Sequence, residues 1–266
     1  MEPTRRAAHE LLALLEATYQ PTHRYVTANP AQYRHLDIAW YDRTAQGLGR
    51  EGFRTICDVE DKTITESPGT VLSAVMVRML LSRDGTIIAG LYHPHLRSFA
   101  LRVLLWLLRK LPPKTTDFET EFTDGSFVAT SNAASAAAIG NGPMIRSEFL
   151  PARTPPVAVL QRHEARVAEH LRAHPGVAAR VACDFDDIRS AQHRMHALKA
   201  AYRGEVGMIT REELERLATP GGAAIVPQVH EELARERAQK AREHPVAVGR
   251  GRVTRVRSPP PAPSIA

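Results

Sequence analysis

VLSAVMVRMLLSRDGTIIAGLYH, residues 71–93, contains two apolar runs separated by an Asp84-Gly85 pair. Both runs are rich in aliphatic residues, several of them β-branched, which favour strands. Asp-Gly between two such runs is typical of a tight hairpin, because glycine adopts the positive φ that the turn requires. The stretch therefore predicts two antiparallel strands joined by a turn.

A second hairpin of similar build is predicted at residues 115–132, TTDFETEFTDGSFVATSN. Phenylalanine and threonine alternate there with acidic residues, and Asp124-Gly125 separates the two halves. Residues 53–60 alternate in the same way, and MIRSEFL at residues 144–150 is a candidate edge strand. These strands are expected to follow one another up and down through one sheet.

The first 50 residues are predicted to be mainly helical. Apolar residues recur at helical spacing over residues 8–19, and Pro21 follows them. A second, shorter helix is expected over residues 36–49, ending at Gly47 and Gly49.

The second half of the chain, residues 154–243, also has a helical pattern. Thr154 is expected to cap a helix whose first position is Pro155, where the missing N–H of proline has no helical partner to lose. Further along, Thr210 and Glu213 have the spacing of a capping box, which marks the start of another helix.

Together these patterns predict an α+β fold with a largely antiparallel sheet of five or six strands and helices packed on one face. The charged strand positions would form the solvated face. We expect a single domain over residues 1–243, with the sheet in 51–150 and helices in 154–243. Residues 244–266, rich in arginine and proline, are predicted to be a disordered tail.

Composition limits the classes of function. The chain has 266 residues, 43% hydrophobic, which is enough for a substantial core, and its net charge of +6 comes largely from arginines in the tail. Only two cysteines are present, which favours the cytoplasm. The N-terminus lacks the apolar core of a secretion signal, and no stretch reaches the roughly 18–20 apolar residues that span a bilayer.

The segment LRSFALRVLLWLLRKLPPK, residues 96–114, is both apolar and basic. On a helix over residues 96–111 the leucines would fill a broad face. The cations and two aromatic side chains would lie opposite: Phe99, Arg102, Trp106, Arg109 and Lys110. The first interpretation is a core helix between the two hairpins, with its cationic heads reaching water. The alternatives are a helix lying on an anionic membrane surface, and a contact with a protein partner.

In an up-and-down sheet, the end opposite the two Asp-Gly turns gathers several polar residues. They are Glu60, Asp61, Lys62, His93, His95, Asp117 and Asn132. His93 and His95 could supply two imidazoles to a metal, with Asp117 or Glu60 as the third ligand or as an orienting carboxylate, and the metal would then polarise a water molecule. Asn132 completes the candidate catalytic set. Histidine beside proline at a strand end is more often an ordinary turn residue, so we expect no metal.

Known sequence motifs give no further guide. The helical histidines show no complete H-E-x-x-H, because His163-Glu164 is followed by Val167 where the second histidine would stand. Nucleophile-elbow, P-loop and dinucleotide patterns are also absent from the sequence, and we predict no cofactor.

Three classes of function remain open. The strongest anomaly is the apolar basic segment, so we expect a non-catalytic binding or scaffold module, with residues 96–111 as its contact to a membrane surface or a protein partner. The location would then be cytoplasmic, with peripheral membrane association. The alternative is a hydrolase-like enzyme with the His/acid site at one end of the sheet. Nucleic-acid contact through the tail is the least favoured. The sequence leaves the oligomeric state open.

Overall fold

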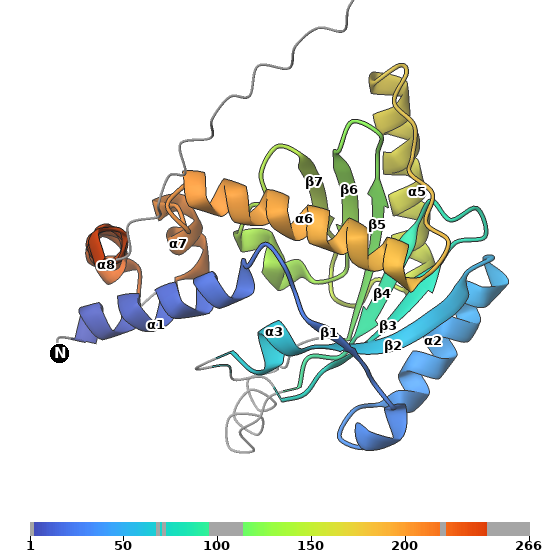
Figure 1. Ribbon diagram of the computed structural model, residues 1–266, viewed down its shortest axis with the longest axis horizontal. Coiled ribbons are helices and arrows are strands. Elements are labelled where there is room, and N and C mark those ends of the chain that lie inside the picture. The colour runs from blue at the N-terminus through green and yellow to red at the C-terminus, as the bar shows by residue number, and fades with distance from the viewer. Residues whose placement is uncertain (1–2, 68–69, 71–72, 96–113, 219–221, 244–266) are drawn as a thin grey trace, which may run out of the picture.

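The strands follow one another through the sheet in sequence order. The computed structural model describes residues 3–67, 70, 73–95, 114–218 and 222–243. Its seven-stranded sheet is antiparallel from β1 to β6 and parallel between β6 and β7 (Figure 1). The strands are β1 (Tyr25–Thr27), β2 (Arg54–Asp61), β3 (Met76–Leu81), β4 (Ile88–Tyr92), β5 (Thr115–Glu121), β6 (Phe127–Ser131) and β7 (Ile145–Phe149). The predicted α+β class and the largely antiparallel sheet are confirmed.

Helices cover both faces of this sheet (Figure 1). The helices are α1 (Pro3–Thr18), α2 (Ile38–Arg50), α3 (Lys62–Thr65), α5 (Pro156–Ala173), α6 (Phe185–Glu205), α7 (Arg211–Leu217) and α8 (Val226–Glu243). Two of them, α2 and α5, pack on one face, and α6 crosses the other. Beside the sheet, α1, α7 and α8 pack together around their own apolar cluster.

The two faces of the sheet have separate cores. On the first face, Leu48 of α2 and Leu160 of α5 pack in one cluster with Phe118 of β5. On the second face, Ile188 of α6 packs in a cluster with Met79 of β3. Burying a large apolar side chain contributes about 1.5–3 kcal/mol, so both helical layers are held by their cores.

The prediction was wrong in two details, the number of strands and the placement of helices on one face only. It took the charged positions of β5 to be solvated, whereas α6 lies over them. Arg194 of α6 donates two hydrogen bonds to Glu121, at 2.6 and 2.7 Å, and the Gln192 amide donates to Glu119. The additional strand, β1, has three residues, too few for an alternating pattern to be recognised.

Both Asp-Gly hairpin turns form as predicted. Gly85 has φ +75° and Gly125 has φ +83°, the left-handed region that glycine adopts without strain. In each turn the aspartate carboxylate, of Asp84 or Asp124, accepts the N–H two residues further along. These turns fix the register of the two hairpins.

The helix ends agree only in part with the prediction. The capping box of Thr210 and Glu213 is present at the start of α7. However, α5 begins at Pro156, with Pro155 as the N-cap and no capping side chain among the described residues, so Thr154 does not cap it. The predicted end of α2 at Gly47 and Gly49 is also wrong, because the helix continues to Arg50.

The predicted helix over residues 96–111 and the tail at 244–266 lie outside the described residues. The contact residues proposed for that helix lie outside them as well: Phe99, Arg102, Trp106, Arg109 and Lys110. Within the described ranges, no helix combines the length and apolarity needed to cross a bilayer.

Candidate functional site

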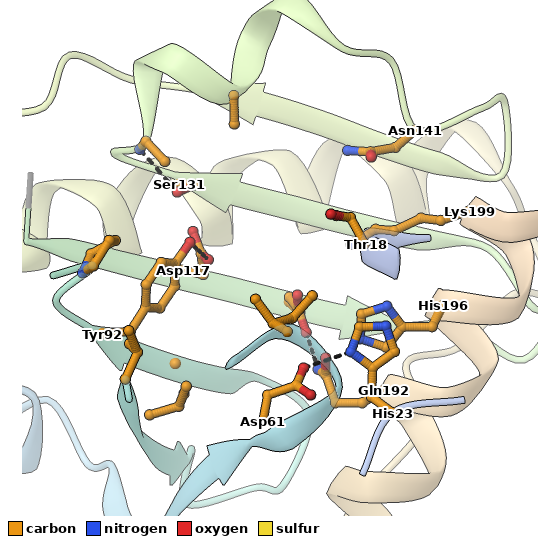
Figure 2. Close-up of a pocket in the computed structure, with 18 of the residues that line it drawn as sticks. Thr18, His23, Asp61, Tyr92, Asp117, Ser131, Asn141, Gln192, His196 and Lys199 are labelled. Atoms are coloured by element: carbon orange, nitrogen blue, oxygen red, sulfur yellow. Dashed lines mark hydrogen bonds and ion pairs between the residues drawn. The ribbon is translucent and has the colours of Figure 1, made fainter. Parts of the chain in front are cut away.

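A cavity of about 460 Å³ lies between the second face of the sheet and α6. Strands β3, β4 and β5 form its floor, α6 forms one wall, and the end of α1 contributes Thr18. Figure 2 shows Asp117 beside Tyr92 at one end, and His23, His196 and Gln192 grouped toward the other. A cavity of this size suits a small organic molecule.

The walls of the cavity are mainly apolar. Strand periodicity places Val77 and Met79 of β3 on the same face as Ile88 of β4. Loops and neighbouring elements supply further apolar lining, including Tyr25, Ile64, Val75, Pro94, Ile139 and Phe149. An apolar ligand surface would leave water on entering this space, which is the main source of affinity in such sites.

Two carboxylates face the cavity from β5. Because side chains two positions apart share a strand face, Asp117 and Glu119 lie together there. The Tyr92 hydroxyl donates a 2.6 Å hydrogen bond to Asp117 Oδ2, and Gln192 donates to Glu119. Burial raises the pKa of both carboxyl groups. The Ser131 and Tyr92 hydroxyls and the charge of Lys199 oppose this shift only in part at Asp117, and Lys199 and the Gln192 amide oppose it only in part at Glu119. Repulsion from Asp117 raises the pKa of Glu119 further.

A second polar group lies toward the other end of the cavity. His23 Nδ1 is 2.5 Å from Asp61 Oδ2, and the His23 ring stacks on His196 with centroids 3.6 Å apart. The Tyr25 hydroxyl lies 3.2 Å from His196 Nε2, within hydrogen-bond distance. Burial lowers the pKa of His196 to about 2, so this imidazole is neutral at physiological pH.

Helix α6 brings its polar residues to the cavity through helical periodicity. Gln192, His196 and Lys199 are spaced four and three residues apart, which places them on one helix face. The N-cap of this helix is Asp184, whose carboxylate accepts the Asp187 N–H at 3.0 Å. This cap fixes where the helix begins, and therefore which of its residues face the sheet.

Of the five predicted catalytic residues, Asp117 lines the cavity, whereas Glu60 lies on the opposite face of the sheet. Tyr33 and Thr65 each donate a hydrogen bond to the Glu60 carboxylate at 2.7 Å, and Lys62 Nζ lies 2.9 Å from it. Burial by itself would raise the pKa of Glu60, but these three partners outweigh it and lower the pKa. Glu60 therefore has a stable set of structural partners.

Asn132 has a similar structural role. Its side chain accepts the Thr116 N–H at 2.8 Å and donates to the carbonyl of Lys114 at 3.2 Å. It thus ties the end of β6 to the start of β5, and its amide is occupied by backbone groups.

The two predicted histidines lie away from Asp117. The His93 N–H donates to the Tyr41 hydroxyl at 2.9 Å, and burial lowers the pKa of the His93 imidazole. His95 Nδ1 lies 3.1 Å from the Ser73 hydroxyl. Within the described part of the chain, no hydrogen bond joins His93 to Asp117 or Glu60. The structure therefore divides the predicted catalytic set between two places.

Sequence reasoning missed most of the polar residues that line the cavity. Among them are His23, Tyr92, Glu119, Gln192, His196 and Lys199. Two sequence signals could have grouped some of them. The alternation of residues along β5 places Glu119 on the same strand face as Asp117, and the helical spacing in α6 places Gln192, His196 and Lys199 on one helix face. In the described ranges, no group of three or more His, Cys, Asp or Glu side chains is arranged to hold a metal ion.

The cavity combines apolar walls with two half-buried acids and one ammonium group, an arrangement suited to holding an amphipathic small molecule in one orientation. Comparisons of the chain with protein-family models, with curated proteins and with solved structures find no match.

Proposed function

We propose that this protein is a non-catalytic binding module, and that its ligand is a small organic molecule held between the sheet and α6. The observation that carries the proposal is the cavity itself, with a glycine in its floor. The polar groups at its two ends would orient the ligand, and the apolar walls would supply most of the affinity.

Gly90 supports a ligand because, among the described residues around it, no close contact or backbone strain requires a glycine. It lies in the middle of β4, paired with Met79 and Asp117. Its φ lies outside the left-handed region, and an added Cβ would come no closer than 3.8 Å to Val77 Cγ1. Glycine weakens a strand interior, and it often marks a place where a ligand approaches the backbone closely.

A binding role fits the cavity better than the hydrolase alternative. A hydrolytic serine or cysteine needs a base within hydrogen-bond reach. Among the described cavity residues, no serine or cysteine is hydrogen-bonded to a histidine. The Ser131 hydroxyl instead accepts the Ala133 N–H at 3.0 Å. The His/acid set proposed for hydrolysis is divided between two faces of the sheet, as described above.

Filling the cavity from its floor tests the proposal. N-phenyl-1-naphthylamine, a neutral apolar dye, becomes fluorescent when it leaves water, and we expect it to bind the full-length protein. Gly90→Phe places an aromatic ring in the space the dye needs, so its affinity should fall by about tenfold or more. Fluorescence titration measures the change.

The matched control is Gly90→Ala. Its single methyl group has room at 3.8 Å from Val77, so we expect less than about a threefold loss of dye affinity. Thermal unfolding of both variants shows that they are folded. The proposal is wrong if the wild-type protein gives no enhancement, or if folded Gly90→Phe binds the dye as the wild type does.

The membrane or partner contact predicted for residues 96–111 stays a prediction. If it is a membrane contact, the protein should sediment with vesicles containing phosphatidylserine and much less with pure phosphatidylcholine. Each basic residue near such a surface contributes about 1 kcal/mol, so Arg109→Glu should weaken binding about tenfold or more. Arg172→Glu reverses an exposed charge on α5 and serves as the control. Equal sedimentation of the two variants would end the membrane interpretation.

A further inference from the structure

We infer that the ligand of this cavity carries a cationic amine, held against Asp117 and Glu119, on an aromatic or aliphatic body. This inference rests on the proposed binding function and adds the chemical class of the ligand. It depends on the charges that face the cavity, on one unsatisfied oxygen atom, and on the apolar walls.

The acids that line the cavity outnumber its cations. Asp117 and Glu119 contribute two carboxyl groups and Lys199 contributes an ammonium, whereas the Asp61 carboxylate already has His23 Nδ1 beside it at 2.5 Å. The imidazole of His196 carries no charge at neutral pH, because its pKa is lowered to about 2. When the acids are ionised, a cation entering the cavity is therefore attracted, and an anion is repelled.

The Asp117 carboxylate has one oxygen atom that can accept a further hydrogen bond. Its Oδ2 atom takes the Tyr92 hydroxyl, whereas Oδ1 is buried without a hydrogen-bond partner in the part of the chain that the structure describes. A buried acceptor without a donor is unfavourable, and most such atoms in proteins are paired. An ammonium group supplies up to three N–H donors, and a small shift of the side chain would bring Oδ1 to one of them.

The walls define the remainder of the ligand. The floor beside Asp117 is Gly90, which leaves the backbone open to a flat or narrow group. Val77 and Met79 lie on the same floor, so an aryl or alkyl body attached to the amine would contact apolar atoms. A primary or secondary amine on an aromatic or branched aliphatic skeleton satisfies both requirements.

Displacement of the naphthylamine dye by three matched probes tests this inference. The probes are 2-phenylethylamine, which is a cation, 2-phenylethanol, which is neutral, and 3-phenylpropanoate, which is an anion. We expect the amine to bind the full-length protein about tenfold more tightly than the alcohol, and the anion to bind most weakly.

The variants Asp117→Asn and Glu119→Gln keep the shapes of the two side chains but remove their charges. We expect each to reduce the ratio of amine to alcohol affinity severalfold, and the double variant to bring it close to one. Glu121→Gln is the matched control. Glu121 follows on the same face of β5 but lies outside the cavity, where it contacts Arg194, so the ratio should stay at the wild-type value.

The two proposals fail in different ways. If the dye does not bind the wild-type protein, the proposed binding function is wrong. If the dye binds but the alcohol or the anion competes as well as the amine, the binding function stands and the amine inference is wrong. Thermal unfolding is measured for every variant, so that a variant that fails to fold is recognised.

The pH dependence gives a second readout. Because burial raises the pKa of both carboxyl groups, they take up protons earlier than exposed acids as the pH falls. Amine affinity should therefore decrease with falling pH, while alcohol affinity changes little. The other titratable or charged groups that line the cavity are Tyr19, His23, Tyr25, Asp61, Tyr92, His196 and Lys199. In the double variant Asp117→Asn/Glu119→Gln, the pH dependence of amine affinity should become nearly the same as that of alcohol affinity. An amine pH profile unchanged from the wild type in this variant would contradict the inference.

Discussion

We expect Arg203→Met to lower the free energy of unfolding by about 3–5 kcal/mol. The Arg203 side chain is fully buried, and its two Nη atoms lie 2.7 and 2.8 Å from the two oxygens of Glu213. Without the guanidinium, the Glu213 carboxylate remains buried with no opposite charge beside it. The cost of that unpaired charge, rather than the loss of attraction, determines the size of the effect.

Two control variants distinguish the stability effect of this buried ion pair from that of an exposed ion pair. In Arg203→Met combined with Glu213→Leu both charges are removed, and much of the stability should return. Arg211 and Glu215 form an exposed ion pair with a nitrogen–oxygen distance of 2.9 Å. Arg211→Ala removes this pair and should lower the free energy of unfolding by less than about 1 kcal/mol. Urea unfolding followed by circular dichroism measures all three. The explanation is wrong if Arg203→Met costs no more than Arg211→Ala.

This buried pair also supports one wall of the cavity. Glu213 accepts the Gly140 N–H at 2.7 Å, and Arg203 donates to the Gly140 carbonyl. The neighbours of that glycine, Ile139 and Asn141, both line the cavity. The pair therefore holds α6, α7 and a cavity-lining loop together, and stability and ligand affinity should change together in Arg203→Met.

Local patterns were enough to predict most of the sheet. The Asp-Gly pairs of the two hairpins combine a turn signal with apolar runs on both sides, and strands that are hairpin neighbours in sequence are neighbours in the sheet. No comparable signal marks β1. Its three residues pair with β2 through Tyr25 and Thr27, and that pairing depends on tertiary contacts across more than 30 residues.

The candidate site was predicted less well, for a geometrical reason. Grouping residues by the end of the sheet ignores which face each side chain is on, and consecutive residues of a strand alternate between faces. Glu60 and Asp61 are adjacent in sequence, yet Glu60 contacts Tyr33 on one side and Asp61 contacts His23 on the other. A cavity on one face therefore receives only part of such a group.

The remaining cavity residues depend on which helix covers which face. The spacing of Gln192, His196 and Lys199 shows that they share a helix face, but the pattern does not identify the strands that this face meets. From the sequence alone, the alternating acidic residues of β5 predict a solvated face, because the pattern does not show that a helix covers them. Its burial beneath α6 is a property of the fold as a whole.

The close approach of the first hairpin turn to the segment before α6 leads to the second large effect. Gly85 and Gly125 occupy equivalent positions in the two Asp-Gly turns, both with positive φ. A Cβ on Gly85 would lie 2.4 Å from the Ala182 carbonyl oxygen and 2.9 Å from Val181 Cγ1. A Cβ on Gly125 would meet no described atom within 4 Å.

We therefore expect Gly125→Ala to cost about 1 kcal/mol, from backbone strain alone, and Gly85→Ala about 3 kcal/mol or more, from the same strain plus a steric clash. The clash falls on a segment held by the Ala182 N–H, which donates to the Gly85 carbonyl at 2.9 Å. Because residues 181–182 lead directly into α6, Gly85→Ala should also weaken dye binding, whereas Gly125→Ala should not. Urea unfolding and dye titration of both variants measure the two effects. Equal losses of stability would mean that turn strain alone, and not contact with the segment before α6, accounts for the glycine at position 85.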